Sequence, residues 1–315
     1  MTTSTVPSDA GTKKRRRIRV GSHAVDFVIY CVVGIVSLVT LFPFIYIISA
    51  SVSNPMNLVS GDVWFLPVGF SLKAYERIFT SVTILRSFGN SVFFTVVITF
   101  LNVMNSMLAG YGLSRHGLVF RKSIVLFILL PLYFSGGLIP SFIIIAKLGL
   151  YNTLGAIILP SVVSIWNIIL ARTYITGLPA SLKEAAIIDG AHELRIFRSI
   201  ILPLSKPMIA VLALYTALAV WNSWFNYMIY LPKRTEWHPL QMFLTKVLIW
   251  GNMNAVLSLS ENADPEILKN KLLMAAVGSQ LKFTVMVVAS APVIAVYPFV
   301  QKYFIKGALL GSLKE

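Results

Sequence analysis

Six long apolar blocks interrupt this sequence and restrict what the chain can fold into. Each is about as long as, or longer than, the roughly 20 apolar residues that an α-helix needs to cross the hydrocarbon core of a bilayer. The predicted spans are Val25–Ala50, Ser87–Leu113, Ile124–Ala146, Ala156–Ile175, Met208–Tyr230 and Phe283–Tyr303. Because backbone groups in lipid must be satisfied within the protein, we expect helices, with kinks where prolines fall in or beside the blocks. The sequence therefore predicts an all-α integral membrane protein with six transmembrane helices.

Composition agrees with a membrane protein and excludes other classes. Hydrophobic residues make up 57% of the chain and charged residues only 12%, which leaves too little polar surface for a soluble globule. The net charge of +15 does not indicate nucleic-acid binding, because the basic residues flank apolar blocks rather than form an aromatic-interleaved patch. The single cysteine, Cys31, lies in an apolar run, so it can form no internal disulfide and is most simply a packing residue.

The distribution of basic residues predicts the orientation. Residues 1–22 read as a disordered basic tail, and the apolar run that follows is longer than the 7–15 residues of a cleavable signal core. With this tail in the cytoplasm, well over half of the 27 Lys and Arg residues lie on the inner side, as the positive-inside rule requires. We predict residues 23–307 as the transmembrane domain and residues 308–315 as a second cytoplasmic tail.

Two outer connections are long. The segment Ser53–Arg86 contains aromatic and turn residues that favour a structured cap. In the connection 232–280, the apolar piece Leu240–Met253 is too short for a span and predicts an outer amphipathic helix. Its polar continuation, Ser258–Lys271, reads as a solvated loop, with contact to a delivery protein as the alternative.

A charged island over residues 181–207 separates the fourth and fifth spans. Ser181 and Glu184 have the spacing of a capping box, which would start a short helix. Gly190 supplies the conformational freedom for a sharp exit, and a second short helix should follow until Pro203 removes a backbone donor. The pattern predicts a helical hairpin in water beside the membrane.

The residues of this hairpin resemble the EAA loop of ABC-importer permease subunits, in the carbohydrate branch. In that family the loop is the coupling helix that docks in a cleft of the cytoplasmic ATPase, and the resemblance implies the same role here. An ordinary amphipathic loop helix is the alternative. The implied ATPase-coupling residues are Glu184, Ala185, Ala186, Asp189, Gly190, Ala191, Phe197 and Pro203.

The resemblance extends over most of the chain. It is carried by Asn90-Ser91, by the pattern Ala109–Arg115, by Trp221-Asn222, and by Gln301–Gly307, while Ser135–Pro160 is similar to a subgroup linked to oligosaccharide import. The ending, residues 311–315, departs from the Gly-rich finish of maltose-type relatives. The resemblance implies the type I importer fold in a bacterial or archaeal cytoplasmic membrane. It also implies four kinds of partner: a second homologous permease, two cytoplasmic ATPase subunits, an extracytoplasmic solute-binding protein and a carbohydrate substrate.

Motifs for chemistry within the chain are missing from the sequence. There is no G-x-x-x-x-G-K-[ST], no H-E-x-x-H and no G-x-S-x-G, so we expect no catalytic residue, no metal site and no cofactor in this chain, with ATP used by a partner. A secondary transporter is the alternative, but acidic residues inside the spans are almost absent apart from Asp26 at an edge. A non-sugar solute is the alternative cargo.

Polar and aromatic residues within the spans indicate a possible solute path. Amides and aromatic rings suit the hydroxyls and flat C–H faces of sugars, whereas helix packing and interfacial anchoring explain the same residues at least as well. The candidates are Trp166, Asn167, Trp221, Asn222, Trp224 and Asn226.

Overall fold

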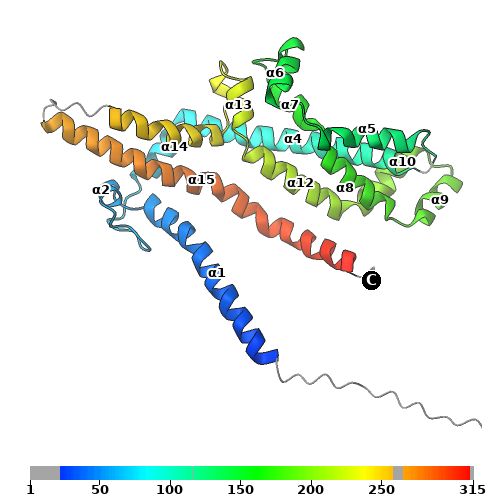
Figure 1. Cartoon of the computed structure of the whole chain (residues 1–315), viewed down its shortest axis with the longest axis horizontal. Helices are drawn as coiled ribbons and strands as arrows, with labels where there is room; N and C mark the ends of the chain where they lie inside the picture. Colours follow the sequence, from blue (N-terminus) through cyan, green and yellow to red (C-terminus); the bar gives the residue numbers. More distant parts are fainter. Residues whose placement is uncertain (1–21, 116, 258–264, 313–315) are drawn as a thin grey trace, which may run out of the picture.

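The computed structural model describes residues 22–115, 117–257 and 265–312, and every regular element in these ranges is a helix. Figure 1 shows α4 running along α8 and α12, with the long α15 beside α14 and α12, and α1 leaning away from the rest. The helices are α1 Ser22–Ser51, α2 Pro55–Val59, α3 Lys73–Thr80, α4 Val82–Ser114, α5 Arg121–Tyr133, α6 Leu138–Lys147, α7 Gly155–Val162, α8 Ile165–Thr176, α9 Ala180–Ile188, α10 Glu193–Ile196, η2 Phe197–Ile201, α11 Leu202–Leu204, α12 Lys206–Trp221, α13 Phe225–Tyr230, η3 Thr235–Trp237, α14 Leu240–Leu257 and α15 Pro265–Ser312.

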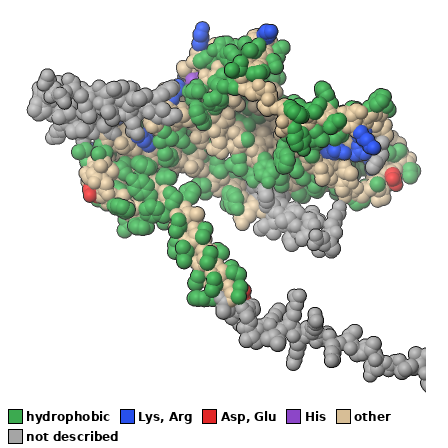
Figure 2. All heavy atoms as spheres, in the orientation of Figure 1, with side chains coloured by type: hydrophobic (Ala, Val, Ile, Leu, Met, Phe, Trp, Pro, Cys, Tyr) green, Lys and Arg blue, Asp and Glu red, His purple; other side chains and the backbone are tan. Residues whose placement is uncertain are grey.

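Four helical stretches in the described ranges are long and apolar enough to cross a membrane, and the number rises to six if each of two bent helix pairs is one span. The four stretches are Val25–Ser51, Val82–Ser114, Gly155–Thr176 and Ala276–Pro298. Apolar side chains cover α1 and much of the visible face in Figure 2, as expected of a surface that meets lipid. The predicted all-α fold with six spans is confirmed.

The third predicted span is a bent pair rather than a straight helix. α5 and α6 meet at 115°. Between them Gly137 has a φ of +79°, which residues with a Cβ rarely adopt. Pro131 and Pro140 each lack a backbone donor on either side of the bend. The segment Ile124–Ala146 therefore breaks where its sequence cannot continue an α-helix.

The fifth predicted span, Met208–Tyr230, also divides into two helices. α12 ends at Trp221, and α13 begins only at Phe225. The side-chain amide of Asn222 donates to the carbonyl of Leu218 at 2.9 Å, so this side chain takes up a backbone acceptor at the end of α12. Periodicity alone could not indicate this break, because the residues on both sides are equally apolar.

The central bundle is closely packed where α4 crosses α8. Gly110 of α4 lies directly against Ala171 and Arg172 of α8. Side chains from both helices then continue into a buried cluster that includes Met107 and Ile175. The absence of a side chain at residue 110 is what permits this close approach.

The outer connections are ordered by hydrogen bonds. The predicted cap over Ser53–Arg86 is confirmed: it contains α2 and α3, and the Ser53 hydroxyl accepts from the Val68 N–H at 3.1 Å. The helix predicted over Leu240–Met253 is present as α14 and runs four residues beyond Met253, while its outer position and amphipathic character stay predictions. The predicted loop Ser258–Lys271 lies partly outside the described residues. Its second part is wrong, because α15 already begins at Pro265, a residue well suited to the first helical turn.

Polar side chains of α15 hold the end of α1. Gln280 donates to the carbonyls of Ser51 and Ser71, at 3.1 Å each, and Thr284 donates to Ser51 at 3.3 Å. Both side chains are fully buried. These bonds satisfy the Ser51 carbonyl at the end of α1 and the Ser71 carbonyl of the cap, so α15 holds the end of α1 and the cap together.

Gly110→Ala should destabilise the protein, whereas Gly112→Ala on the same helix should not. A Cβ on residue 110 would lie 2.7 Å from the Ala171 Cβ and 2.8 Å from the Arg172 backbone N, while residue 112 has open space around it. Overpacking of this kind typically costs about 1–3 kcal/mol. The measurement is the thermal unfolding midpoint of the purified protein in nanodiscs. Equal midpoints for both variants would contradict the close α4–α8 contact.

Candidate coupling hairpin and polar cavity

The first helix of the hairpin, α9, begins at Ala180, two residues earlier than the predicted capping box indicated. Pro179 occupies the position before the helix with a φ of −56°, and no side chain caps the first turn. Ser181 lies inside that turn, where its hydroxyl is not at the N-cap. The predicted capping box between Ser181 and Glu184 is therefore wrong, because the proline with its fixed φ sets the helix start.

The end of α9 is the predicted glycine exit. Gly190 has a φ of +73°. Its N–H donates to the Ile187 carbonyl at 3.0 Å, and the Ala191 N–H donates to the Ala186 carbonyl at 2.9 Å. This pair of bonds is a Schellman motif, which requires the left-handed conformation that glycine adopts without strain. The role predicted for Gly190 in ending the helix is confirmed.

The second half of the hairpin is a continuous helix with a widened turn. The Nδ1 atom of His192 accepts from the Arg195 N–H at 3.2 Å and caps α10. The π-helical turn η2 follows, in which the Leu202 N–H bonds to the Phe197 carbonyl. Pro203 lies just after this turn, and the helix ends one residue later, at Leu204, close to the predicted end. The chain then bends by 79° into α12.

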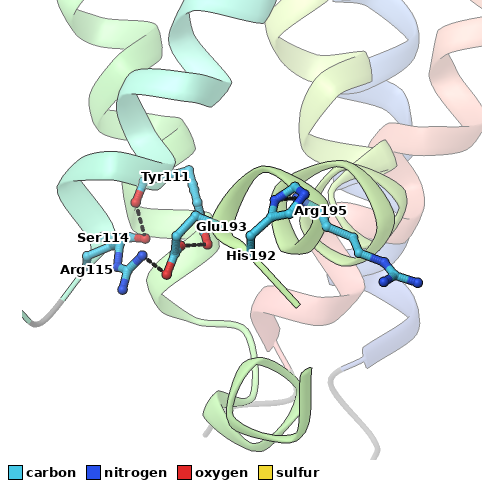
Figure 3. A network of polar contacts seen from close by, with 6 residues as sticks. All are labelled: Tyr111, Ser114, Arg115, His192, Glu193 and Arg195. Carbon is cyan, nitrogen blue, oxygen red and sulfur yellow. Dashed lines mark hydrogen bonds and ion pairs between the residues drawn. The ribbon is translucent and has the colours of Figure 1, made fainter. Parts of the chain in front are cut away.

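A polar cluster anchors the hairpin to the end of α4 (Figure 3). Glu193 forms an ion pair with Arg115, and the Tyr111 hydroxyl donates to its other carboxylate oxygen at 2.5 Å. The Tyr111 ring also packs against Phe197, with 5.4 Å between the ring centroids. Sequence reasoning did not assign Tyr111, Arg115 or Glu193 to the site, although the first two belong to the pattern Ala109–Arg115. The hairpin is thus joined to α4 by charge, hydrogen bond and ring contact together.

A second cation approaches the same tyrosine from α9. The Lys183 ammonium lies 5.4 Å from the Tyr111 ring centroid, within cation–π range. Partial burial lowers the pKa of Lys183, and the positive charge of Arg115 lowers it further. Both helices of the hairpin therefore contact one residue of α4.

The hairpin has a buried face and an exposed face. Among the predicted coupling residues, Ala186 and Phe197 are buried in a cluster with Ala171 and Ile175, and Ala191 packs at its edge. Glu184, Ala185, Asp189, Gly190 and Pro203 are exposed. Sequence reasoning missed the large apolar side chains on the exposed face, which are Leu182, Ile187, Ile188 and Leu194. Ile188 is 85% exposed, so this face is apolar surface that the described residues leave uncovered.

A cavity of about 340 Å³ lies between α4, α7, α8, α12 and α13. The described side chains around it supply amides, hydroxyls and one deep aromatic ring, and none of them carries a charge. The lining residues are Ile98, Asn102, Ile157, Ser161, Ser164, Asn167, Tyr215, Thr216, Ala219, Val220, Ser223, Asn226 and Tyr227.

One wall of the cavity is a buried network of three side chains from three helices. Asn167 of α8 donates to the Asn102 Oδ1 of α4 at 2.8 Å and to the Thr216 hydroxyl of α12 at 3.0 Å. The Asn102 amide in turn donates to the Ser161 carbonyl at 2.9 Å. Asn102 and Thr216 could have been found by the rule that selected Asn167, because both are polar residues inside predicted spans.

The six residues predicted for the solute path lie in different surroundings, and only Asn167 and Asn226 line the cavity. Trp221 is buried, and its Nε1 donates to the Ala289 carbonyl of α15 at 3.0 Å. Asn222 is exposed and bonds its own helix. Trp224 packs edge-on against Phe225, and Trp166 is 60% exposed. The structure thus brings two of the six together.

These helices and this hairpin define a transport protein of one family. Residues 102–309 match the family described as "Binding-protein-dependent transport system inner membrane component", so the chain belongs to it. The matched range contains the hairpin, the α4 end that anchors it and every residue that lines the cavity except Ile98.

Individual relatives agree. The chain is 37% identical over 294 residues to the polygalacturonan/rhamnogalacturonan transport system permease protein YtcP of Bacillus subtilis (strain 168), with 92% of this chain and 98% of that protein covered. It is 36% identical to protein LplC of the same organism, with 89% and 92% covered. Its fold is similar to a chain in the crystal structure of a bacterial ABC transporter involved in the import of the acidic polysaccharide alginate. There the TM-score is 0.81 and the identity 31%, over 90% of this chain and 98% of that chain.

Glu193→Ala should loosen the hairpin from α4 without unfolding the protein. The variant loses an ion pair and a hydrogen bond that are partly exposed to solvent, so amide exchange in α10 should accelerate by about threefold to tenfold. Arg195→Ala is the matched control, because the Arg195 guanidinium points away from the cluster in Figure 3. Hydrogen exchange with mass spectrometry measures both. Similar exchange in α10 for both variants would rule out an anchoring role for Glu193.

Proposed function

We propose that this chain is the transmembrane permease subunit of an ATP-driven ABC importer that carries an oligosaccharide delivered by an extracytoplasmic binding protein. The observation that carries the proposal is the hairpin. It presents an apolar exposed face, and the ion pair of Glu193 with Arg115 holds it to the end of the transmembrane helix α4. The family description and the named relatives support the transport role.

The exposed face of the hairpin is the docking surface for the ATPase. The sequence contains no phosphate-binding loop, so ATP is bound and hydrolysed by two separate cytoplasmic subunits, and this chain binds no cofactor. Ile188 and Leu194 are exposed by 85% and 64%, and their burial in an ATPase cleft would supply apolar contact area. The predicted residues Glu184 and Asp189 lie on the same hairpin and contribute polar contacts.

Movement of the docked hairpin is transmitted to the spans. The movement reaches α4 through the cluster of Glu193, Arg115 and Tyr111. It reaches α8 through the buried cluster that contains Phe197 and Ala171. Solute binding on the other side must then affect the ATPase by the same coupling free energy, since linkage is reciprocal. A second homologous permease completes the pathway, and the spans rock between inward and outward openings.

The membrane orientation follows from charge and from the ATPase. The hairpin lies in the cytoplasm of a bacterial or archaeal cell, with both chain termini on the same side. The concentration of Lys and Arg on this side supports the assignment. The cap over Ser53–Arg86, η3 and α14 then face the binding protein.

The polar cavity is part of the solute path. Hydroxyls and amides such as those of Ser223 and Asn226 can bond sugar hydroxyls, and the Tyr227 ring can cover a C–H face. An uncharged lining permits weak binding, which transport requires because the solute must also leave. Because the names of two similar proteins specify polygalacturonan and alginate, oligosaccharides of uronic acids are the first solutes to test.

Ile188→Asp should abolish retention of the ATPase. The substitution places an unpaired carboxylate in the centre of an apolar contact, which costs several kcal/mol when buried, and we expect at least about a tenfold loss of co-purified ATPase. Val119→Asp is the control, because Val119 is also strongly exposed, at 71%, but lies outside the hairpin. Pull-down from membranes with matched permease levels is the measurement. Normal ATPase retention by Ile188→Asp would exclude the hairpin as the docking surface.

Asn226→Ala should change solute uptake, whereas Asn222→Ala should not. The two asparagines lie four residues apart, but only Asn226 lines the cavity, while Asn222 is bonded to its own helix. Loss of one hydrogen bond to the solute typically corresponds to about 1 kcal/mol, or roughly a fivefold rise in half-saturating solute. Uptake into proteoliposomes that contain the complete importer measures it. If both variants transport alike, the cavity is not on the path.

A further inference from the structure

A second polar cleft, of about 230 Å³, lies at the end of α4 opposite the hairpin. It is formed by the first turns of α4, by η3 and by the start of α14. Its charged and titratable lining side chains are Arg86, Glu236, His238 and Lys246. Residues 86 and 111 are separated by about 37 Å along α4. The cleft is therefore distinct from both the hairpin anchor and the polar cavity.

The cations of the cleft are available for a ligand. Among the described residues, the Arg86 guanidinium has no hydrogen-bond or ion-pair partner. The Lys246 ammonium lies 3.3 Å from the His238 Nδ1. The His238 Nε2 lies 3.0 Å from the Leu231 carbonyl oxygen, which can only accept a hydrogen bond. Nε2 therefore carries the proton, and Nδ1 accepts a hydrogen bond from Lys246. A neutral imidazole thus holds Lys246 in place and leaves its charge uncompensated.

His238 stays neutral for physical reasons. Burial lowers the pKa of His238, and the Lys246 ammonium lowers it further, against the opposing effects of the Leu231 carbonyl and Glu236. At neutral pH the imidazole is therefore uncharged and compatible with its lysine neighbour.

The one carboxylate of the cleft is compensated from outside. Glu236 forms an ion pair with Arg234 at 3.7 Å, and Arg234 does not line the cleft. The cleft thus contains two cations, Arg86 and Lys246, and one carboxylate, Glu236. That carboxylate is already paired with a third cation outside the cleft. A concave site with this balance attracts anions.

The wall of the cleft is held rigidly to α4. The Asn90 amide donates to the Glu236 carbonyl at 2.8 Å and to the His238 carbonyl at 3.2 Å. The Ser91 hydroxyl accepts from the Leu240 N–H at 2.8 Å. Because Arg86 lies one turn from Asn90 on the same helix, the backbone positions from which Arg86 and Lys246 extend are held close together before a ligand arrives.

We propose that this cleft is a carboxylate-binding subsite that takes one uronate unit of an acidic oligosaccharide as it enters from the binding protein. The inference rests on the proposed function and adds to it the solute class and the residues that recognise it. Arg86 pairs with the carboxylate through parallel N–H donors, and Lys246 adds a second positive charge that attracts the same carboxylate. The volume is below the 300–1,000 Å³ typical of sites that enclose a whole ligand, which suits one unit of a longer chain.

The division between a charged cleft and an uncharged cavity fits transport of such a solute. Carboxylates are recognised at the outer end, where water and salt reach the site and limit the strength of the pairing. The path deeper along α4 then provides only neutral hydrogen-bonding groups, so an acidic chain is not trapped there.

The test compares an acidic probe with its neutral ester on the complete importer in nanodiscs. Binding of radiolabelled trigalacturonate and of its fully methyl-esterified form is measured for wild type, Arg86→Gln and Lys246→Gln. Each variant should weaken trigalacturonate binding by about tenfold and change ester binding by less than about twofold. Lys233→Gln is the control, because this exposed lysine precedes η3 but lies outside the cleft, and it should change neither.

Several results would overturn the inference. These are unchanged trigalacturonate binding in both variants, equal weakening for both probes, or no trigalacturonate binding by wild type. Another such result is that the variants weaken the binding of both probes only when the binding protein is present. That result would identify an acidic side chain of the binding protein as the occupant of the cleft, and it would also overturn the inference. Uptake by the same variants, reconstituted into proteoliposomes, separates the two proposals. Binding that depends on Arg86 without uptake of any saccharide would contradict import and retain the subsite, whereas uptake with unchanged binding would contradict the subsite alone.

Discussion

The structure depends on the requirement that every backbone carbonyl inside the membrane has a hydrogen-bond donor. In the fourth span the Asn102 side-chain amide is such a donor. The fourth span breaks between α7 and α8, which frees the carbonyls of Ser161 and Val162. Asn102 and Asn105 donate to them at 2.9 and 3.3 Å. With no water in the hydrocarbon core, these amides are what allow the helix to be interrupted here. The polar cavity borders this interruption, because Ser161 and Ser164 line it.

One helix connects all the functional regions. α4 carries the outer cleft at Arg86, the cavity at Asn102 and the hairpin anchor at Tyr111. It is also the helix against which both α8 and α12 pack. A single rigid element with a site at each end and one between is a direct physical route for coupling, because a displacement at one end moves the other. The coupling proposed for this chain therefore requires no series of small side-chain rearrangements over this distance.

The sequence predicted those features that depend on local chemistry or on long apolar runs. The spans followed from hydrophobic length, and Gly190 from the need for a positive φ. Features decided by neighbours were not predictable in the same way. Trp221 looked suitable for a sugar, but its indole N–H is taken by the Ala289 carbonyl of a helix far along the chain. The prediction of a Ser181 capping box was wrong because Pro179 fixes the start of α9. The anchor could not be predicted from local sequence, because Glu193 contacts residues more than 75 positions earlier.

The attachment of α1 has a consequence for the order in which the protein is made. Ser51 at the end of α1 is held by Gln280 and Thr284, which follow it by 229 and 233 residues. During synthesis α1 can enter the bilayer alone, since its surface is apolar and meets little of the chain. Its docking must wait until α15 has been translated, and contacts of such sequence separation close slowly. The first helix to insert is therefore among the last to find its place.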